Sequence, residues 1–208
     1  MSLASEERRE LCDLLDDIGP DAPTLCEGWT TRDLTSHLLA RERKPWAAPG
    51  IVVPQLDALM RRAMRGYDDQ PWPALVQKLR SGPPTWSIYN VPKLDRMLNG
   101  NEYFVHHEDV RRGGPDWEPR PPHPKRDDAV WRSLGASARV LYRNSPVGVV
   151  LRRPDGAELV ARRGDRSVTI VGEPAELMLH AYGRSAIRVE LEGDPADVST
   201  LSGTSRRF

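Results

Sequence analysis

A proline-rich, charged stretch at residues 115–128 divides this sequence into halves with different patterns. Proline fixes its own φ angle and lacks a backbone N–H, so such a stretch extends neither a helix nor a sheet easily. Apolar residues recur at helical spacing before it, and short β-branched runs follow it. We therefore predict a helical domain at residues 1–114, a linker at 115–128 and a small α+β domain at 129–208.

The first half has the apolar periodicity of a helical bundle. Apolar residues spaced three or four positions apart predict helices at residues 4–18, 30–43 and 55–66. They also predict a short helix from residue 72 and a last one at 101–112. Thr30 followed by Asp33 has the pattern of a capping box, which would start the second helix. The aromatic stretch at residues 86–94 is predicted to cover a pocket.

The second half alternates between the two patterns. Residues 128–142 and those from Glu173 onward have helical periodicity. Between them lie three short β-branched runs separated by turn residues, which predict consecutive hairpins, and a final strand is predicted at residues 187–192. The three runs are residues 147–151, 158–161 and 167–171.

Composition excludes several classes of protein. Thirty basic and thirty acidic residues cancel, so the net charge favours neither a nucleic acid nor a membrane surface as partner. No apolar run approaches the roughly 18 residues that span a bilayer. The N-terminus has the charge but not the apolar core of a secretory signal, so we expect a cytoplasmic protein. Cys12 and Cys26, the two cysteines, are then expected to be free thiols.

The last helix of the first half carries two side chains suited to one metal ion. Glu102 and His106 are four residues apart, so they lie on one face of a helix with roughly 5–6 Å between their Cβ atoms. A catalytic zinc ion commonly takes three protein ligands and keeps an open position. His37, within the apolar stripe of the second helix, is the best candidate for the third ligand, with water as the fourth.

Each of these residues also has a structural interpretation. His37 can be a core histidine bonded to a backbone carbonyl, and His106 and His107 can be surface residues of a charged helix. His107 projects about 100° away from His106 around the helix, so it does not share the same ion easily. Asp109 can orient the free ring nitrogen of His106 or be a solvated acid.

Two motifs resemble those of a known family. The segments Trp29-Thr-x-Arg-Asp-Leu-x-x-His37-Leu and Glu102-Tyr-Phe-Val-His106-His-Glu-Asp-Val are similar to the metal-binding domain of the mycothiol-dependent maleylpyruvate isomerase family, within the DinB-like four-helix-bundle superfamily. In that family a histidine on the second helix and a Glu-x-x-x-His on the last bind zinc. The resemblance implies that His37, Glu102 and His106 are the metal ligands.

The resemblance extends to the second half of the chain. The segments Gly172-Glu-Pro-Ala-Glu-Leu-x-Leu-x-x-Tyr-Gly-Arg184 and Val189-Glu-Leu-Glu-Gly-Asp194 are similar to the family's small C-terminal α+β domain. The preference for arginine over lysine is compatible with an actinobacterial subgroup of this family. No residue identifies maleylpyruvate as the substrate.

The first functional hypothesis is a metal-dependent thiol transferase or isomerase. Zinc, or another divalent metal, would bind a small thiol such as mycothiol as the thiolate, which would add to a small electrophile. Arg184 is the candidate catalytic residue, as a clamp for a substrate carboxylate. Its structural interpretation is a cation at a helix C-terminus.

Two alternatives belong to other classes. The metal can be structural, with a sterol-carrier-like C-terminal domain that holds an apolar ligand against Leu177, Met178 and Tyr182. A zinc-bound water can instead hydrolyse a substrate with Glu108 or Asp33 as the general base. The sequence does not predict the oligomeric state.

Overall fold

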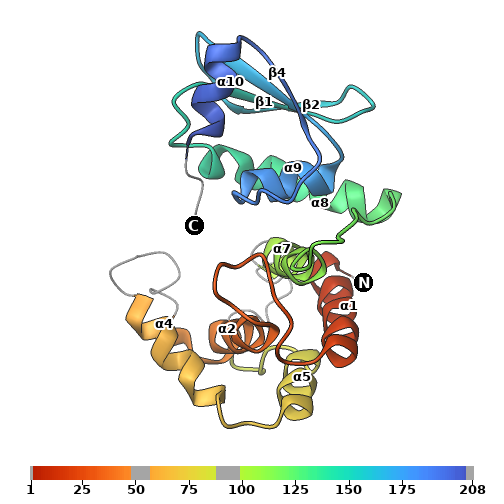
Figure 1. Cartoon of the computed structure of the whole chain (residues 1–208), viewed down its shortest axis with the longest axis vertical. Helices are drawn as coiled ribbons and strands as arrows, with labels where there is room; N and C mark the ends of the chain where they lie inside the picture. Colours follow the sequence, from red (N-terminus) through yellow and green to blue (C-terminus); the bar gives the residue numbers. More distant parts are fainter. Residues whose placement is uncertain (1, 48–56, 88–98, 205–208) are drawn as a thin grey trace. The chain divides into compact units, whose positions relative to one another are not determined.

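The structure is a computed structural model that describes residues 2–47, 57–87 and 99–204. The chain forms two compact units, Met1–Glu118 and Pro119–Phe208, each of which can be followed in Figure 1. The fold class predicted from the sequence is confirmed, because the first unit is helical and the second combines helices with a sheet. No described helix is both long and apolar enough to span a bilayer.

The first unit is a bundle of helices. Helix α1 packs against α7 and α5, and α2 packs against α5 and α4 (Figure 1). The predicted third helix is described only from residue 57, and residues 88–94 of the predicted aromatic cover lie outside the described residues. The helices are α1 (Leu3–Ile18), α2 (Thr31–Arg43), α4 (Asp57–Met64), α5 (Trp72–Arg80) and α7 (Gly100–Arg111), with short 3-10 helices at Pro45–Ala47 and Arg65–Tyr67.

The ends of α1 and α2 follow from local sequence. Gly19 ends α1 with φ at 78°, a left-handed conformation that costs glycine little. The capping box is confirmed at the start of α2, where the Thr30 side chain accepts from the backbone N–H of Asp33 and the Asp33 carboxylate accepts from that of Thr30. Both predicted helices, at 4–18 and 30–43, are therefore confirmed.

The apolar core of the first unit contains side chains from five helices. Burying each large aliphatic side chain contributes about 1.5–3 kcal/mol to folding, so this core favours the packed bundle over separate helices. The fully buried leucines and valine are Leu11, Leu15, Leu34, Leu38, Leu39, Leu75, Val76 and Leu79.

The loop between α1 and α2 is attached to the end of α7. The backbone N–H of Leu25 donates to the carbonyl of Asp109 at 3.0 Å. Gly113 lies directly against the backbone of Pro23 and Thr24, where a Cβ atom would come within 2.8 Å of the Thr24 Cα. The loop is therefore placed beside α7 by backbone contacts that a side chain at position 113 would prevent.

The second unit is a four-stranded sheet with helices. The strand order is β2-β1-β3-β4, and α9 packs against α8. Leu177 and Met178 are fully buried, as core residues are. The elements are α8 (Pro124–Leu141), β1 (Gly148–Arg152), β2 (Glu158–Arg162), β3 (Ser167–Val171), α9 (Pro174–Ala181), β4 (Glu190–Glu192) and α10 (Pro195–Ser202).

The prediction of consecutive hairpins is wrong for the second pair. Strands β1 and β2 form an antiparallel hairpin, but β3 pairs with β1 in parallel and not with β2. Turn residues between β2 and β3 indicate a change of direction, but they do not specify which strand is the partner. Strand β1 is therefore an interior strand, hydrogen-bonded to β2 on one edge and to β3 on the other.

Helix α8 begins within the stretch predicted to be a linker. It begins at Pro124 rather than at residue 128, and the His123 side chain caps it by accepting from the backbone N–H of Arg126. Proline is tolerated in the first turn because its missing N–H would have no partner there in any case. The last proline of this stretch, Pro124, is therefore the first residue of α8, although the stretch also separates the helical half of the sequence from the half with strands.

The close contact of Gly113 with the backbone of Pro23 predicts how a substitution there changes the stability of the protein. We expect Gly113→Ala to lower the free energy of unfolding by about 2 kcal/mol or more, because the added methyl group overlaps the backbone of Pro23. Gly114→Ala is the matched control, because a Cβ at that neighbouring position meets nothing within 4 Å. Urea unfolding followed by circular dichroism measures both, and equal stability of the two variants would contradict the proposed backbone contact.

Candidate metal centre

Helices α2 and α7 bring the three predicted ligands together. His37 comes from α2, Glu102 and His106 come from α7, and one ligand atom from each lies within 4.8 Å of the others. The two imidazole rings are nearly edge-on, with centroids 5.4 Å apart and an interplanar angle of 72°. The Nε2 of His106 is 3.5 Å from Oε2 of Glu102. The group has the donor types and the spacing of a three-ligand site for a divalent metal.

His37 is a buried histidine with an unused nitrogen. Its side chain lies beside the indole of Trp29, with ring centroids 5.2 Å apart. Within the part of the chain that the structure describes, its buried Nδ1 has no hydrogen-bond partner. Burial, aided by the charges of His106 and Arg41, lowers the pKa of His37 to about 3. The ring is therefore neutral at pH 7, which is the form in which imidazole binds metal ions.

His106 is oriented by a carboxylate on the same helix. Its Nδ1 lies 3.0 Å from Oδ2 of Asp109, which is fully buried. The Cys26 thiol donates to that same oxygen at 3.3 Å. Burial would lower the pKa of His106, but hydrogen bonds to Asp109, Cys26 and Glu102 raise it well above its usual value. With Nδ1 directed at Asp109, Nε2 is the nitrogen that faces Glu102.

Glu102 is the least buried of the three, with its side chain 22% exposed. The Nε of Arg41 lies 3.7 Å from its Oε2. Burial would raise the pKa of Glu102, but the charge of Arg41 and the hydrogen bond with His106 lower it below its usual range. The group is therefore an anionic carboxylate at pH 7, able to bind a cation.

His107 faces a different helix from His106. Its Nδ1 lies 2.7 Å from Oε2 of Glu7 on α1, and both side chains are buried. The carboxylate of Glu10 lies close to the same pair. The 100° rotation between consecutive helical residues thus separates the two neighbouring histidines, as the sequence indicated.

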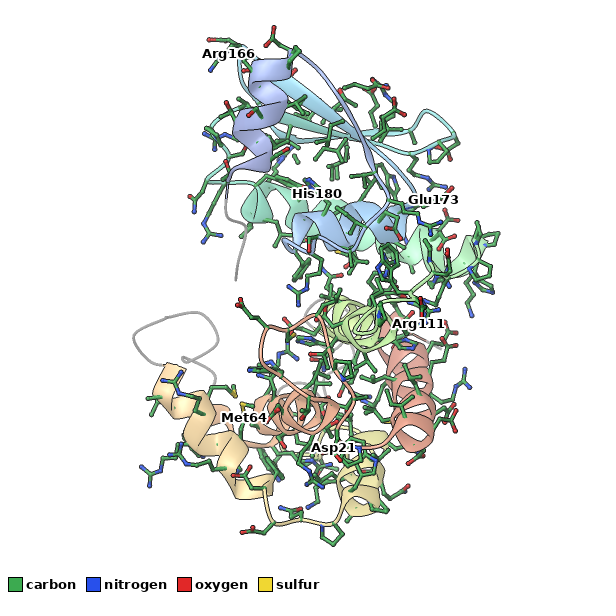
Figure 2. The ribbon with its side chains drawn as sticks, in the orientation of Figure 1. Asp21, Met64, Arg111, Arg166, Glu173 and His180 are labelled. Atoms are coloured by element: carbon green, nitrogen blue, oxygen red, sulfur yellow. The ribbon has the colours of Figure 1, made fainter. Side chains whose placement is uncertain are left out.

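The two residues considered as general bases have other partners. The carboxylate of Asp33 accepts from the backbone N–H and the hydroxyl of Thr30. Glu108 is buried and accepts from Arg112 at 2.7 Å and from Arg111, which Figure 2 labels near the end of α7. Both carboxylates thus stabilise helix ends in this structure, which removes the support for a hydrolytic mechanism based on them.

Arg184 lies in the second unit, just after α9. Its backbone N–H donates to the carbonyl of Leu179, while that of Gly183 donates to His180, as in a Schellman motif. Gly183 has φ at 76°, which explains glycine there. The guanidinium donates to the carbonyl of Tyr182 at 2.8 Å, so the side chain satisfies the end of its own helix. This contact fits the structural interpretation of Arg184.

Sequence reasoning missed the residues that surround the ligands. Arg41 follows His37 by one helical turn, a spacing that puts both on one face, but its contact with Glu102 was not predicted. The hydrogen bond between Cys26 and Asp109 was also not predicted, because it joins segments far apart in the chain. The contact of Trp29 with the His37 ring also lies within this part of the site.

A family model and two solved structures are similar to parts of this chain. Residues 2–85 match the family model described as the mycothiol maleylpyruvate isomerase N-terminal domain. The matched segment contains His37 and ends before Glu102. No curated protein sequence matches the chain.

Two solved structures share the fold over most of their length. A crystal structure of a mutant of the mycothiol-dependent maleylpyruvate isomerase has a TM-score of 0.60 and 16% identity, and it covers 92% of this chain and 90% of its own. A second crystal structure of the mycothiol-dependent maleylpyruvate isomerase has a TM-score of 0.57, 17% identity and the same coverage. At this identity the likeness of both structures shows the fold alone, and the family model matches residues 2–85 of the 208-residue chain.

Proposed function

We propose that this protein is a zinc-dependent transferase or isomerase that uses a small thiol, such as mycothiol, against a small electrophilic substrate. The observation that carries the proposal is the convergence of His37, Glu102 and His106 from two helices, with ligand atoms within 4.8 Å of one another. The match of residues 2–85 to the mycothiol maleylpyruvate isomerase N-terminal domain model supports the choice of mycothiol. Two imidazoles and one carboxylate are a donor set that leaves a fourth position for an exchangeable ligand.

The side chains fit a divalent ion. His37 is neutral and its Nδ1 has no partner among the described residues, which would be a costly arrangement for a purely structural histidine. Asp109 fixes the ring of His106, a role that carboxylates often have beside metal-binding histidines. When bound, zinc would supply Lewis acidity that favours the thiolate over the thiol.

The chain's own residues would perform the remaining tasks. Asp109 holds the proton on Nδ1 of His106, which leaves Nε2 for the ion once its proton is released. The indole of Trp29 packs beside the His37 ring, with ring centroids 5.2 Å apart. The proposed role of Arg184 is to bind a carboxylate of the electrophile through its guanidinium.

Metal binding tests the first part of the proposal. We expect the purified protein, after removal of metal by a chelator, to bind about one zinc ion per chain, and His37→Ala to lower its zinc affinity by at least about tenfold, because one of three ligands is lost. His123→Asn is the control, because it removes an exposed histidine and retains a residue suited to the cap of α8. Competition with a zinc indicator gives the affinities. Equal zinc affinity of His37→Ala and the unmodified protein would contradict the ligand assignment.

Arg184 is tested with a carboxylate-bearing electrophile. With mycothiol and maleylpyruvate as substrates, we expect Arg184→Met to lower kcat/KM by about tenfold or more, because a charge-assisted hydrogen bond to the substrate is lost. The zinc content should not change. Arg184→Lys should recover only part of the rate, because an ammonium cannot bind a carboxylate in the bidentate way. Unchanged kinetics in Arg184→Met would leave Arg184 the role of a helix C-terminal residue.

A further inference from the structure

Arg41 is a buried arginine that lies against a candidate ligand. It follows His37 by one turn of α2, and its side chain is only 5% exposed. Its Nε is 3.7 Å from Oε2 of Glu102, the same oxygen that lies 3.5 Å from Nε2 of His106. Helix α2 thus supplies the candidate ligand His37 and also the cation Arg41, which lies beside the candidate ligand Glu102 on α7.

The guanidinium is also fixed to the start of α7. Its Nη1 donates to the side-chain oxygen of Asn99, which is fully buried and directly precedes α7. Arginine presents its donors in a rigid planar fork, so a contact on one side restricts the orientation of the other. The contacts with Asn99 and Glu102 hold the guanidinium between α2 and the first turn of α7.

The position of Arg41 determines the charge of the centre. The carboxylates of Glu102 and Asp109 together would cancel the charge of a divalent ion, and imidazole ligands bind such an ion in their neutral form. Without a further cation, an added thiolate would make the buried centre negative, which is unfavourable in a low dielectric. Arg41 leaves the centre with a net positive charge before the anion binds.

We propose that Arg41 is a positioning residue that holds the Glu102 carboxylate and supplies the positive charge that lets the metal centre accept an anionic fourth ligand. The inference rests on the proposed function, because it concerns the ligand that the open position would take. The class of ligand is a small anion with a soft or polarisable donor atom, of which a thiolate is the example relevant to catalysis.

Cobalt-loaded protein provides the test, because the visible spectrum of Co²⁺ reports its ligands without any turnover. Thiocyanate is the anionic probe and imidazole is the neutral one. For Arg41→Met we expect thiocyanate affinity to fall by about tenfold or more, as Coulomb's law predicts for a unit charge within several ångströms of the anion. Imidazole affinity should change by less than about threefold, and Arg41→Lys, which retains the charge, should stay close to the unmodified protein.

The outcomes separate this inference from the function on which it rests. Unchanged thiocyanate affinity in cobalt-loaded Arg41→Met would overturn it, as would an equal loss in Arg41→Met and Arg41→Lys. Loss of folding or of cobalt in both Arg41→Met and Arg41→Gln would show that Arg41 is structural and would overturn it too. Failure of the unmodified protein to bind cobalt would instead overturn the proposed function itself.

Discussion

The site depends on the cost of burying charge between α2 and α7. Asp109 is removed from solvent and Arg41 nearly so, while Glu102 is only partly exposed. A buried ionised group is tolerated only when a partner of opposite charge or a set of hydrogen bonds compensates the lost hydration. Asp109 therefore lies with His106, and Arg41 lies with Glu102 and Asn99. His37 differs from them, because its buried Nδ1 lacks a partner among the described residues.

The loop between α1 and α2 is held against α7 by backbone contacts, and it contributes side chains to this polar region. Its contact with Gly113 and the hydrogen bond from Leu25 to Asp109 hold it against α7. Two of its side chains then reach the site from outside the bundle, Cys26 at Asp109 and Trp29 at His37. The positions of these groups thus depend on a backbone contact that only glycine permits.

Local features of the site could be predicted from the sequence, and long-range ones could not. The four-residue spacing of Glu102 and His106 fixes their relation within one helix, and the rotation per residue separates His107 from them. The pairing of Cys26 with Asp109, by contrast, joins residues on two elements far apart in the chain. The spacing puts Arg41 on the same face of α2 as His37, but its contact with Glu102 joins two helices and was not predicted.

The same distinction holds for the fold. Capping and periodicity predicted the bounds of α1 and α2, because these signals lie within a few residues of each helix end. The parallel pairing of β1 with β3 was not predicted, because hydrogen bonds between strands depend on tertiary packing. The start of α8 at Pro124 was missed because proline is unfavourable inside a helix and tolerated in its first turn.

X-ray absorption spectroscopy of the zinc-loaded protein tests the central claim most directly, because it counts the donor atoms around the ion. The proposed site predicts only nitrogen and oxygen donors, at about 2.0–2.1 Å, in the thiol-free protein, and one sulfur at about 2.3 Å once mycothiol is added. Sulfur in the thiol-free spectrum would contradict the account, because it would place Cys26 on the ion. A spectrum that mycothiol does not change would contradict the proposed thiol chemistry.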